Sequence, residues 1–207
     1  MQDCQQQEFL HHFPIKSISD LKGKKIGFSV GGFEEALLSG MLQKYNIKMT
    51  DVELVNINFS LSPSLIAQKV DAVIGAFRNF ELNQMDIVNH PGKAFYPEEH
   101  GVPTYEELIY ISNKKNRNNP IFNKFFKAIQ RATLTIINDP ETTWKDFSTY
   151  RKGLDDELNK RAFKDTLTRF ALRPQAHDIQ TYEDFGVFLK QKGIIKKNIP
   201  VNTYAKP

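Results

Sequence analysis

Compact apolar runs alternate with helix-like segments through the first half of this chain. Between the first two runs, apolar residues in 37–45 recur at helical spacing, and Pro63 opens a second short helix. A third helix is expected over about 79–88. The apolar runs that predict strands are 25–30, 52–57 and 71–76. Strands and helices alternating at this spacing predict βαβ units and a largely parallel sheet, so the fold class is α/β.

The pattern changes to helical beyond Pro120. Two further strand-like stretches, 94–96 and 108–112, come first. Apolar residues then recur at helical spacing around Phe122, Trp144, Phe163 and Phe185. These helices carry apolar faces that need a sheet to cover, yet the strands predicted earlier already have helices of their own. The pattern therefore indicates that part of a sheet is missing from this sequence.

Composition narrows the function classes. The chain has 207 residues, 25% of them charged, and a net charge of +4, which is too mild for a nucleic-acid-binding protein. Its single cysteine, Cys4, excludes an internal disulfide and a cysteine-cluster metal site. No apolar run near the start resembles a signal peptide, and none elsewhere is long enough to span a bilayer.

Gly31 and Gly32 form the first candidate ligand loop. They follow a predicted strand and precede a helix, an arrangement whose free backbone N–H groups suit an anion. Glu34 and Glu35 offer the alternative, because two carboxylates in the first helical turn can satisfy the helix end themselves and would repel an anion. Both interpretations stay open at this point.

The second candidate is Asn79 with Glu81, where a buried strand gives way to a helix. Ligands collect at the carboxyl ends of parallel strands, and a glutamate there can bind an amino-heterocycle. The alternative makes Asn79 a helix cap and Glu81 a solvated acid. The five histidines are scattered without metal-ligand spacing, and no serine nucleophile motif is present, so no catalytic residue, metal or cofactor is predicted.

Several strings together resemble one known family. Those strings are DLKGKKIG at 20–27, GGFEE at 31–35, DVELVN at 51–56, VDAVIGAFRNFE at 70–81 and GVPTY at 101–105. They are similar to the thiamine-pyrimidine family, which has type II periplasmic binding-protein architecture. The last two point more narrowly to the ABC-transporter binding proteins for hydroxymethylpyrimidine-type thiamine precursors.

The resemblance implies a domain organisation. Residues 1–16 would be a leader or linker, 17–105 the second α/β lobe, and 106–207 a crossover strand with C-terminal helices that belong to the first lobe. Complete family members begin with a stretch that builds most of the first lobe's sheet, and that stretch has no counterpart here. We therefore expect one complete lobe plus the helical part of the other.

The resemblance also implies a function. The ligand, an aminopyrimidine, would lie between the lobes, and the closed protein would dock on an ABC permease outside the cytoplasm. Gly31, Gly32, Phe33, Asn79 and Glu81 would form the second lobe's wall, with Glu81 as the polar selector and no cofactor. Exposed first-lobe helices would make the chain prone to self-association.

Two alternatives remain open. One is a pyrimidine synthase of the same family, which would use pyridoxal phosphate and a histidine; the cysteine-rich motif of those enzymes has no counterpart here. The other is a truncated fragment without binding activity of its own.

Overall fold

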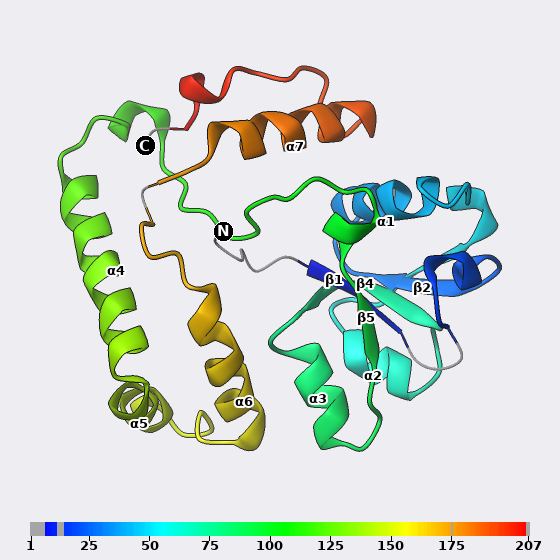
Figure 1. The fold of residues 1–207 in the computed structure, drawn as a ribbon, viewed down its shortest axis with the longest axis horizontal. Helices are drawn as coiled ribbons and strands as arrows, with labels where there is room; N and C mark the ends of the chain where they lie inside the picture. Colours follow the sequence, from blue (N-terminus) through cyan, green and yellow to red (C-terminus); the bar gives the residue numbers. More distant parts are fainter. Residues whose placement is uncertain (1–6, 12–14, 175, 206–207) are drawn as a thin grey trace.

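A five-stranded sheet forms the centre of one half of the molecule (Figure 1). The computed structural model describes residues 7–11, 15–174 and 176–205. The strands are β1 (Gln7–His11), β2 (Lys25–Phe28), β3 (Glu53–Asn56), β4 (Ala72–Phe77) and β5 (Lys93–Phe95), in the order β3-β2-β4-β1-β5. Strands β3, β2 and β4 are parallel neighbours, which confirms the predicted α/β class.

Strand β1 changes the predicted organisation. It lies inside segment 1–16, which the sequence suggested as a leader or linker, yet it pairs antiparallel with both β4 and β5. The sheet is therefore mixed rather than wholly parallel. Hydrophobic patterning missed this strand because the run is short and lies among polar residues.

Three helices cover the sheet: α1 (Phe33–Gln43), α2 (Leu61–Ile66) and α3 (Glu81–Ile87). Helix α1 buries Leu37 and Met41 against Ile26 in one core, whereas α2 and α3 bury Leu65 and Met85 in a second core. The two cores belong to opposite faces of β4, because successive strand residues point to opposite sides. The α/β unit therefore has a packed hydrophobic core on each face of its sheet.

Gly75 interrupts that alternation. Strand β1 pairs Glu8 with Ala76 and Phe9 with Ile74, so Gly75 is an extra residue that forms a β-bulge. Its φ of +98° is a left-handed conformation that glycine adopts readily. Ile74 consequently belongs to the α1 core, whereas Ala76 belongs to the α2–α3 core.

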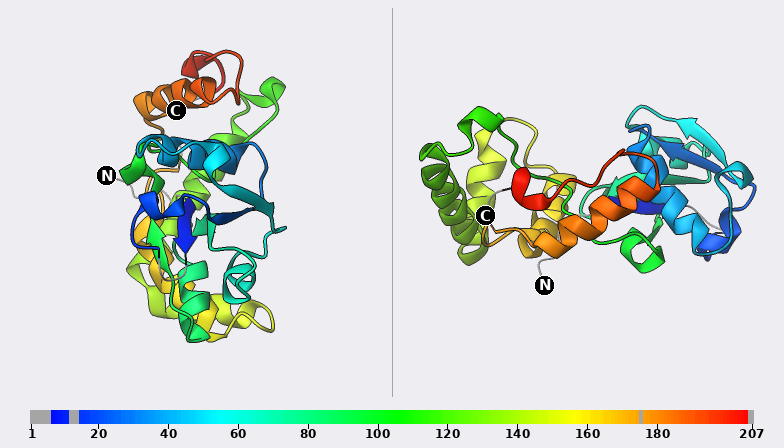
Figure 2. Two further views of the ribbon diagram at one scale, coloured as in Figure 1. Left: turned by 90° about the vertical axis from the view of Figure 1, so that its right-hand side faces the viewer. Right: turned by 90° about the horizontal axis from the view of Figure 1, so that it is seen from above.

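The rest of the chain is mostly helical and extends to one side of the α/β unit (Figure 2). Helix α7 packs back on α1, where the Phe188 ring meets Gly40. The longer helices are α4 (Ile121–Asn138), α5 (Pro140–Tyr150), α6 (Glu157–Thr166) and α7 (Ile179–Gln191). Single 3-10 turns are η1 (Ile18–Leu21), η2 (Met49–Asp51), η3 (Pro97–His100), η4 (Lys114–Asn116), η5 (Leu167–Arg169) and η6 (Val201–Thr203).

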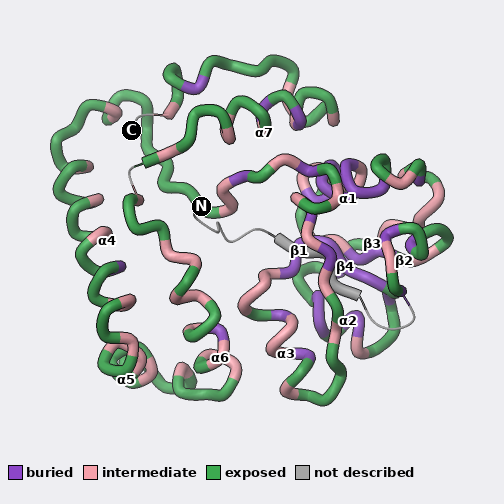
Figure 3. The backbone as a smooth tube through the Cα atoms, viewed as in Figure 1, coloured by how far each residue is buried: buried purple, intermediate pink, exposed green. Residues whose placement is uncertain are grey.

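Helix α4 and the segment before it are poorly buried (Figure 3). Thr133 is the one buried residue that α4 contributes, although the helix is strongly amphipathic. The strand predicted at 108–112 is wrong: these residues form no strand, and Ile111 is 86% exposed. A strand needs a hydrogen-bonded neighbour, and the described strands all lie in the sheet of the α/β unit. Tyr110 instead rests on Phe125 and Phe126 of α4.

Candidate functional site

The two candidate loops lie at one edge of the sheet. Strands β2 and β4 are adjacent and parallel, with Ile26 opposite Ala72 and Gly27 opposite Val73. The Gly31–Gly32 turn after β2 and the Asn79 turn after β4 therefore leave the same carboxyl edge. Helix α3, which begins at this edge, lies between the sheet and α6 (Figure 1). The fold thus brings together residues far apart in sequence at an edge where α/β proteins bind ligands.

The first loop is capped by its own acids. Glu34 Oε2 accepts hydrogen bonds from the N–H groups of Ser29 at 2.7 Å and Val30 at 3.1 Å. Glu35 accepts from the Gly32 N–H at 2.7 Å. The capping interpretation therefore describes this loop, and the expectation that the Gly32 N–H is open to a ligand is wrong. Burial of Glu34 raises its pKa, and the bonds from Ser29 and Val30 oppose that rise.

Glu34 also ties the two loops together. Its side chain fills the space beside Gly75 in β4, and a Cβ atom at Gly75 would collide with Oε1 of Glu34. Glu34 is only 2% exposed. The β-bulge thus makes room for a buried carboxylate that reaches from α1 to β4. Sequence reasoning treated Glu34 as a cap alone, and the glycine that accommodates it is the signal that was missed.

Glu81 is the second buried acid at this edge, with 8% exposure. Its Oε2 accepts from the Phe77 N–H at 2.7 Å, so the carboxylate closes the turn between β4 and α3. Burial raises the pKa of Glu81, while hydrogen bonds from the Phe77 and Glu81 backbones lower it. The alternative of a solvated acid is therefore wrong, although burial alone assigns no ligand.

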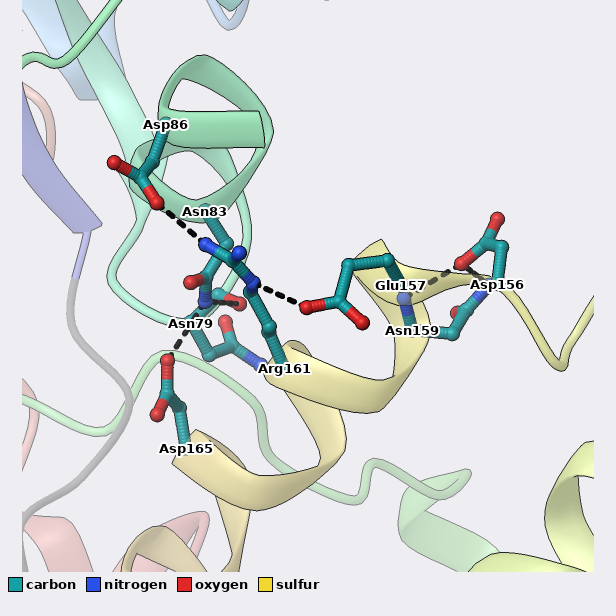
Figure 4. Close-up of polar contacts among 8 residues, drawn as sticks. All are labelled: Asn79, Asn83, Asp86, Asp156, Glu157, Asn159, Arg161 and Asp165. Carbon is teal, nitrogen blue, oxygen red and sulfur yellow. Dashed lines mark hydrogen bonds and ion pairs between the residues drawn. The ribbon is translucent and has the colours of Figure 1, made fainter. Parts of the chain in front are cut away.

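Asn79 is half-buried and faces away from the sheet toward α6. Its Nδ2 donates to Thr166 Oγ1 at 2.7 Å, and the N-cap residue of α3 is Phe80, so the alternative that made Asn79 the helix cap is wrong. Figure 4 shows this turn beside α6. Asn79 thus contacts the helical part of the molecule directly, which the sequence could not show because 87 residues separate the two partners.

Phe33 belongs to an aromatic cluster. Its ring meets Tyr105 at 5.8 Å and Phe185 at 6.3 Å, both edge to face. Tyr105 and Phe185 in turn stack on each other at 4.5 Å. Phe33 therefore anchors the start of α1 against α7. The ring is half-buried, so part of it remains exposed at the surface of the loop.

Phe59 is an aromatic residue at the same edge that sequence reasoning did not single out. It follows β3, is 74% exposed, and has a φ of +62°, a costly conformation for a phenylalanine. Its N–H donates to Ser29 Oγ at 3.0 Å, which holds it beside the end of β2. The signal available in sequence was a lone Phe between the turn residues Asn58 and Ser60.

Arg78 stiffens the turn that carries Asn79. Its Nη2 atom lies 2.6 and 2.8 Å from the two carboxyl oxygens of Glu98, and its guanidinium carbon lies over the Tyr96 ring, 4.1 Å from the ring centroid. The pair is partly buried, with side-chain exposures of 13% and 27%. The ion pair with Glu98 and the cation–π contact together hold the turn that contains Asn79 and precedes Glu81.

A hollow of about 390 Å³ lies elsewhere, between α7 and the tail after it. It is mainly apolar, and none of the five predicted site residues lines it. The Tyr182 hydroxyl donates to Glu106 at 2.5 Å at its wall. In residues 7–11, 15–174 and 176–205, no group of three or more His, Cys, Asp or Glu is arranged to hold a metal. Nor does any helix in these ranges have the length and apolar character needed to cross a membrane.

The overall fold matches that of periplasmic solute-binding proteins. The alkanesulfonate-binding protein SsuA from Xanthomonas axonopodis superposes with a TM-score of 0.68 at 15% identity, covering 97% of this chain and 69% of that one. The aliphatic sulfonate-binding protein SsuA from Escherichia coli gives 0.71 at 13% identity, covering 97% and 65%. The expected type II binding-protein architecture is thereby confirmed.

Residues 8–143 match the family described as NMT1/THI5 like, and the chain belongs to that family. A Haemophilus influenzae protein named as a thiamine biosynthesis protein is 46% identical over 192 residues, covering 92% of this chain and 61% of the relative. The formylaminopyrimidine-binding protein of Halalkalibacterium halodurans is 27% identical over 135 residues, covering 64% and 41%.

Yeast relatives carry an enzyme's name. A 4-amino-5-hydroxymethyl-2-methylpyrimidine phosphate synthase of Saccharomyces cerevisiae is 25% identical over 163 residues, covering 72% of this chain and 47% of the relative. The chain thus spans between 41% and 61% of the length of these three relatives.

Proposed function

We propose that this chain is the solute-binding component of an ABC transporter for a hydroxymethylpyrimidine-type thiamine precursor. It would act outside the cytoplasm without catalysing a reaction, and would deliver its ligand to a membrane permease. The solute-binding fold, the family and the named aminopyrimidine-binding relative support this proposal. Glu81, a buried carboxyl group at the carboxyl edge of parallel strands, carries it.

Glu81 suits a 4-aminopyrimidine for a chemical reason. The ring presents an amino donor beside a ring nitrogen, and a carboxyl group can pair with both positions when one proton is shared between them. Burial raises the pKa of Glu81, which favours the protonated form that donates to the ring nitrogen. Oε2 already accepts from the Phe77 N–H, and its second lone pair would accept from the amino group while Oε1 carries the proton for the ring nitrogen.

Flat aromatic side chains complete the proposed site. Phe59 presents an exposed ring at the same edge, and stacking on a heterocycle would use that face. Phe33 and the Gly31–Gly32 turn would supply the wall beside it. Asn79 would lie where the two parts of the molecule meet.

The test is a thermal melt and a calorimetric titration with 4-amino-5-hydroxymethyl-2-methylpyrimidine. Binding should raise the melting midpoint, because a ligand that binds only the folded state stabilises it. Glu81→Ala should weaken binding about tenfold or more, since the paired hydrogen bonds to the ring are lost. Glu99→Gln, an exposed acid in η3, is the control and should bind like wild type.

Two results would contradict the proposal. One is wild-type affinity that stays unchanged in Glu81→Ala, and the other is equal affinity for the analogue without the amino group. An absorbance change on adding pyridoxal phosphate would instead favour the synthase named for the yeast relatives. A broad melt that no ligand shifts would favour a fragment without binding activity.

A further inference from the structure

Helices α3 and α6 meet along a polar seam that joins the α/β unit to helices α4–α6 (Figure 4). The two helices run in opposite directions, because Asn83 and then Asp86 along α3 pair with Asp165 and the earlier Arg161 on α6. We define the seam by its three side-chain rungs, which are Asn79–Thr166, Asn83–Asp165 and Asp86–Arg161.

The rungs are short and directional. Asn79 Nδ2 donates to Thr166 Oγ1 at 2.7 Å, and Asn83 Nδ2 donates to Asp165 Oδ2 at the same distance. Arg161 Nη1 lies 2.5 Å from Asp86 Oδ2. Asn83 and Asp86 are three residues apart, which places them on one face of α3, and Asn79 lies in the turn just before that helix.

Both ends of the seam are braced from within their own helix. Arg161 Nε also lies 2.7 Å from Glu157 Oε1, one turn earlier on α6. The Thr166 hydroxyl donates to the Ala162 carbonyl at 2.6 Å, so it is oriented to accept from Asn79. Asn83 donates to the Asn79 carbonyl at 3.1 Å as well. These bonds within each helix hold the side chains in the orientations that the seam contacts need.

Apolar contact is directed away from the seam. On α3, Met85 and Leu82 pack into the core of the α/β unit. On α6, Phe163 packs on Trp144 and Phe147 of α5. Joints held by polar and partly exposed pairs are weak individually and open readily, in contrast to a buried apolar interface. This composition suits a contact that must form and break.

We propose that the polar seam is the closing latch between the α/β unit and helices α4–α6, with Asn79 as the positioning residue that couples the latch to the ligand. Asn79 is two residues from Glu81 and reaches Thr166 across the joint. Ligand bound at Glu81 would hold this turn in place, and the latch would in turn hold the ligand. This inference rests on the proposed function for its ligand, but the latch itself can be tested without one.

The decisive variant is Thr166→Val, which keeps the side-chain shape and removes the hydroxyl that Asn79 donates to. It should weaken binding of 4-amino-5-hydroxymethyl-2-methylpyrimidine about tenfold, the value of one lost hydrogen bond at the upper end of its range. Thr166→Ser restores the hydroxyl and should restore the affinity. Gln84→Ala removes a carboxamide from the same helix but from no rung, and should bind like wild type.

A distance measurement tests the latch by itself. Spin labels at Lys69→Cys and Lys145→Cys, both exposed, in a Cys4→Ser background report the separation of the two parts. Thr166→Val and Asp86→Asn should broaden the distance distribution without ligand, and Gln84→Ala should not. An unchanged distribution in both seam variants would overturn the latch. A broadened distribution with wild-type affinity would overturn the coupling through Asn79.

The two proposals fail in different ways. If the wild-type chain does not bind the pyrimidine at all, the proposed ligand is wrong, while the distance measurement still decides the latch. If the wild type binds and Thr166→Ser fails to recover what Thr166→Val loses, the hydroxyl is not the coupling group and the inference fails.

Discussion

Leu37 and Leu134 both lie in helices with recurring apolar positions, but in different settings. Leu37 in α1 has no exposed surface, whereas Leu134 in α4 is 41% exposed. Helix α1 lies on a sheet with a filled core, and α4 has neighbours on only part of its surface. Apolar periodicity predicts a helix equally well in both regions. How much each helix stabilises the fold, however, depends on what covers its apolar face.

The largest effect should come from one substitution made in both regions. Leu37→Ala should lower the free energy of unfolding by about 2–5 kcal/mol, because it leaves a cavity in a packed core. Leu134→Ala should cost less than about 1 kcal/mol, since little buried surface is lost. Urea unfolding followed by circular dichroism measures both. Equal losses would mean that α4 is covered as well as α1.

Glycine substitutions sharpen the same comparison. Gly75→Ala should destabilise the α/β unit by about 1–3 kcal/mol, because it adds a Cβ at positive φ against the Glu34 carboxylate. Gly153→Ala, between α5 and α6, is the matched control: its φ is +87°, but nothing lies near the added atom. The difference between their unfolding midpoints isolates the collision with Glu34. No difference would show that the carboxylate moves aside freely.

Buried charge gives a smaller effect that depends on pH. Among the described residues, the buried acids are Glu34 and Glu81, and both belong to the α/β unit. Burial raises both pKa values, so the folded state binds more protons than the unfolded state just above pH 4.5, the ordinary value. The contribution of these two groups to stability should therefore fall as pH rises through that region.

Glu81→Gln tests this sign. The variant should melt higher than wild type at pH 7 and at nearly the same temperature at pH 4, because the raised pKa of Glu81 makes only the wild type lose stability as pH rises. Exposed Glu99→Gln should change neither melt. A Glu81→Gln variant that is less stable than wild type at pH 7 would contradict the expected direction.

The smallest effect is expected where the two regions meet. Asp86 and Arg161 have side-chain exposures of 60% and 37%, so water and salt screen their attraction. Asp86→Asn should change the urea midpoint too little to resolve. A large loss of stability would mean that the seam holds the fold together rather than joining two parts reversibly.

Much of the α/β unit could be predicted from its sequence. Residues 25–30, 52–57 and 71–76 become β2, β3 and β4 within two residues at each end, because apolar runs bounded by turns have few alternatives. The helices beyond Pro120 are confirmed for the same reason. Strand β1 and segment 108–112 went wrong because a strand is decided by its neighbours, which local patterning does not contain.

The candidate site was predictable only in part. Placement of Gly31, Gly32, Phe33, Asn79 and Glu81 near the ends of adjacent strands follows from topology. The bond between Asn79 and Thr166 and the fit of Glu34 beside Gly75 depend on tertiary contacts across long stretches of sequence. Phe59 was missed because its importance comes from exposure and backbone strain, which composition does not reveal.

The pairing of β1 with β4 also affects when the sheet can form during synthesis of the chain. Its partners in β4 lie 61 residues away for His11 with Ala72 and 70 residues away for Gln7 with Phe77, so β1 leaves the ribosome long before β4 exists. At roughly 5–20 residues per second the delay is several seconds. During that interval β2 and β3 can pair with each other, whereas the two edges of β1 stay open. Nascent chains paused between β1 and β4 are therefore the species that chaperones would have to protect.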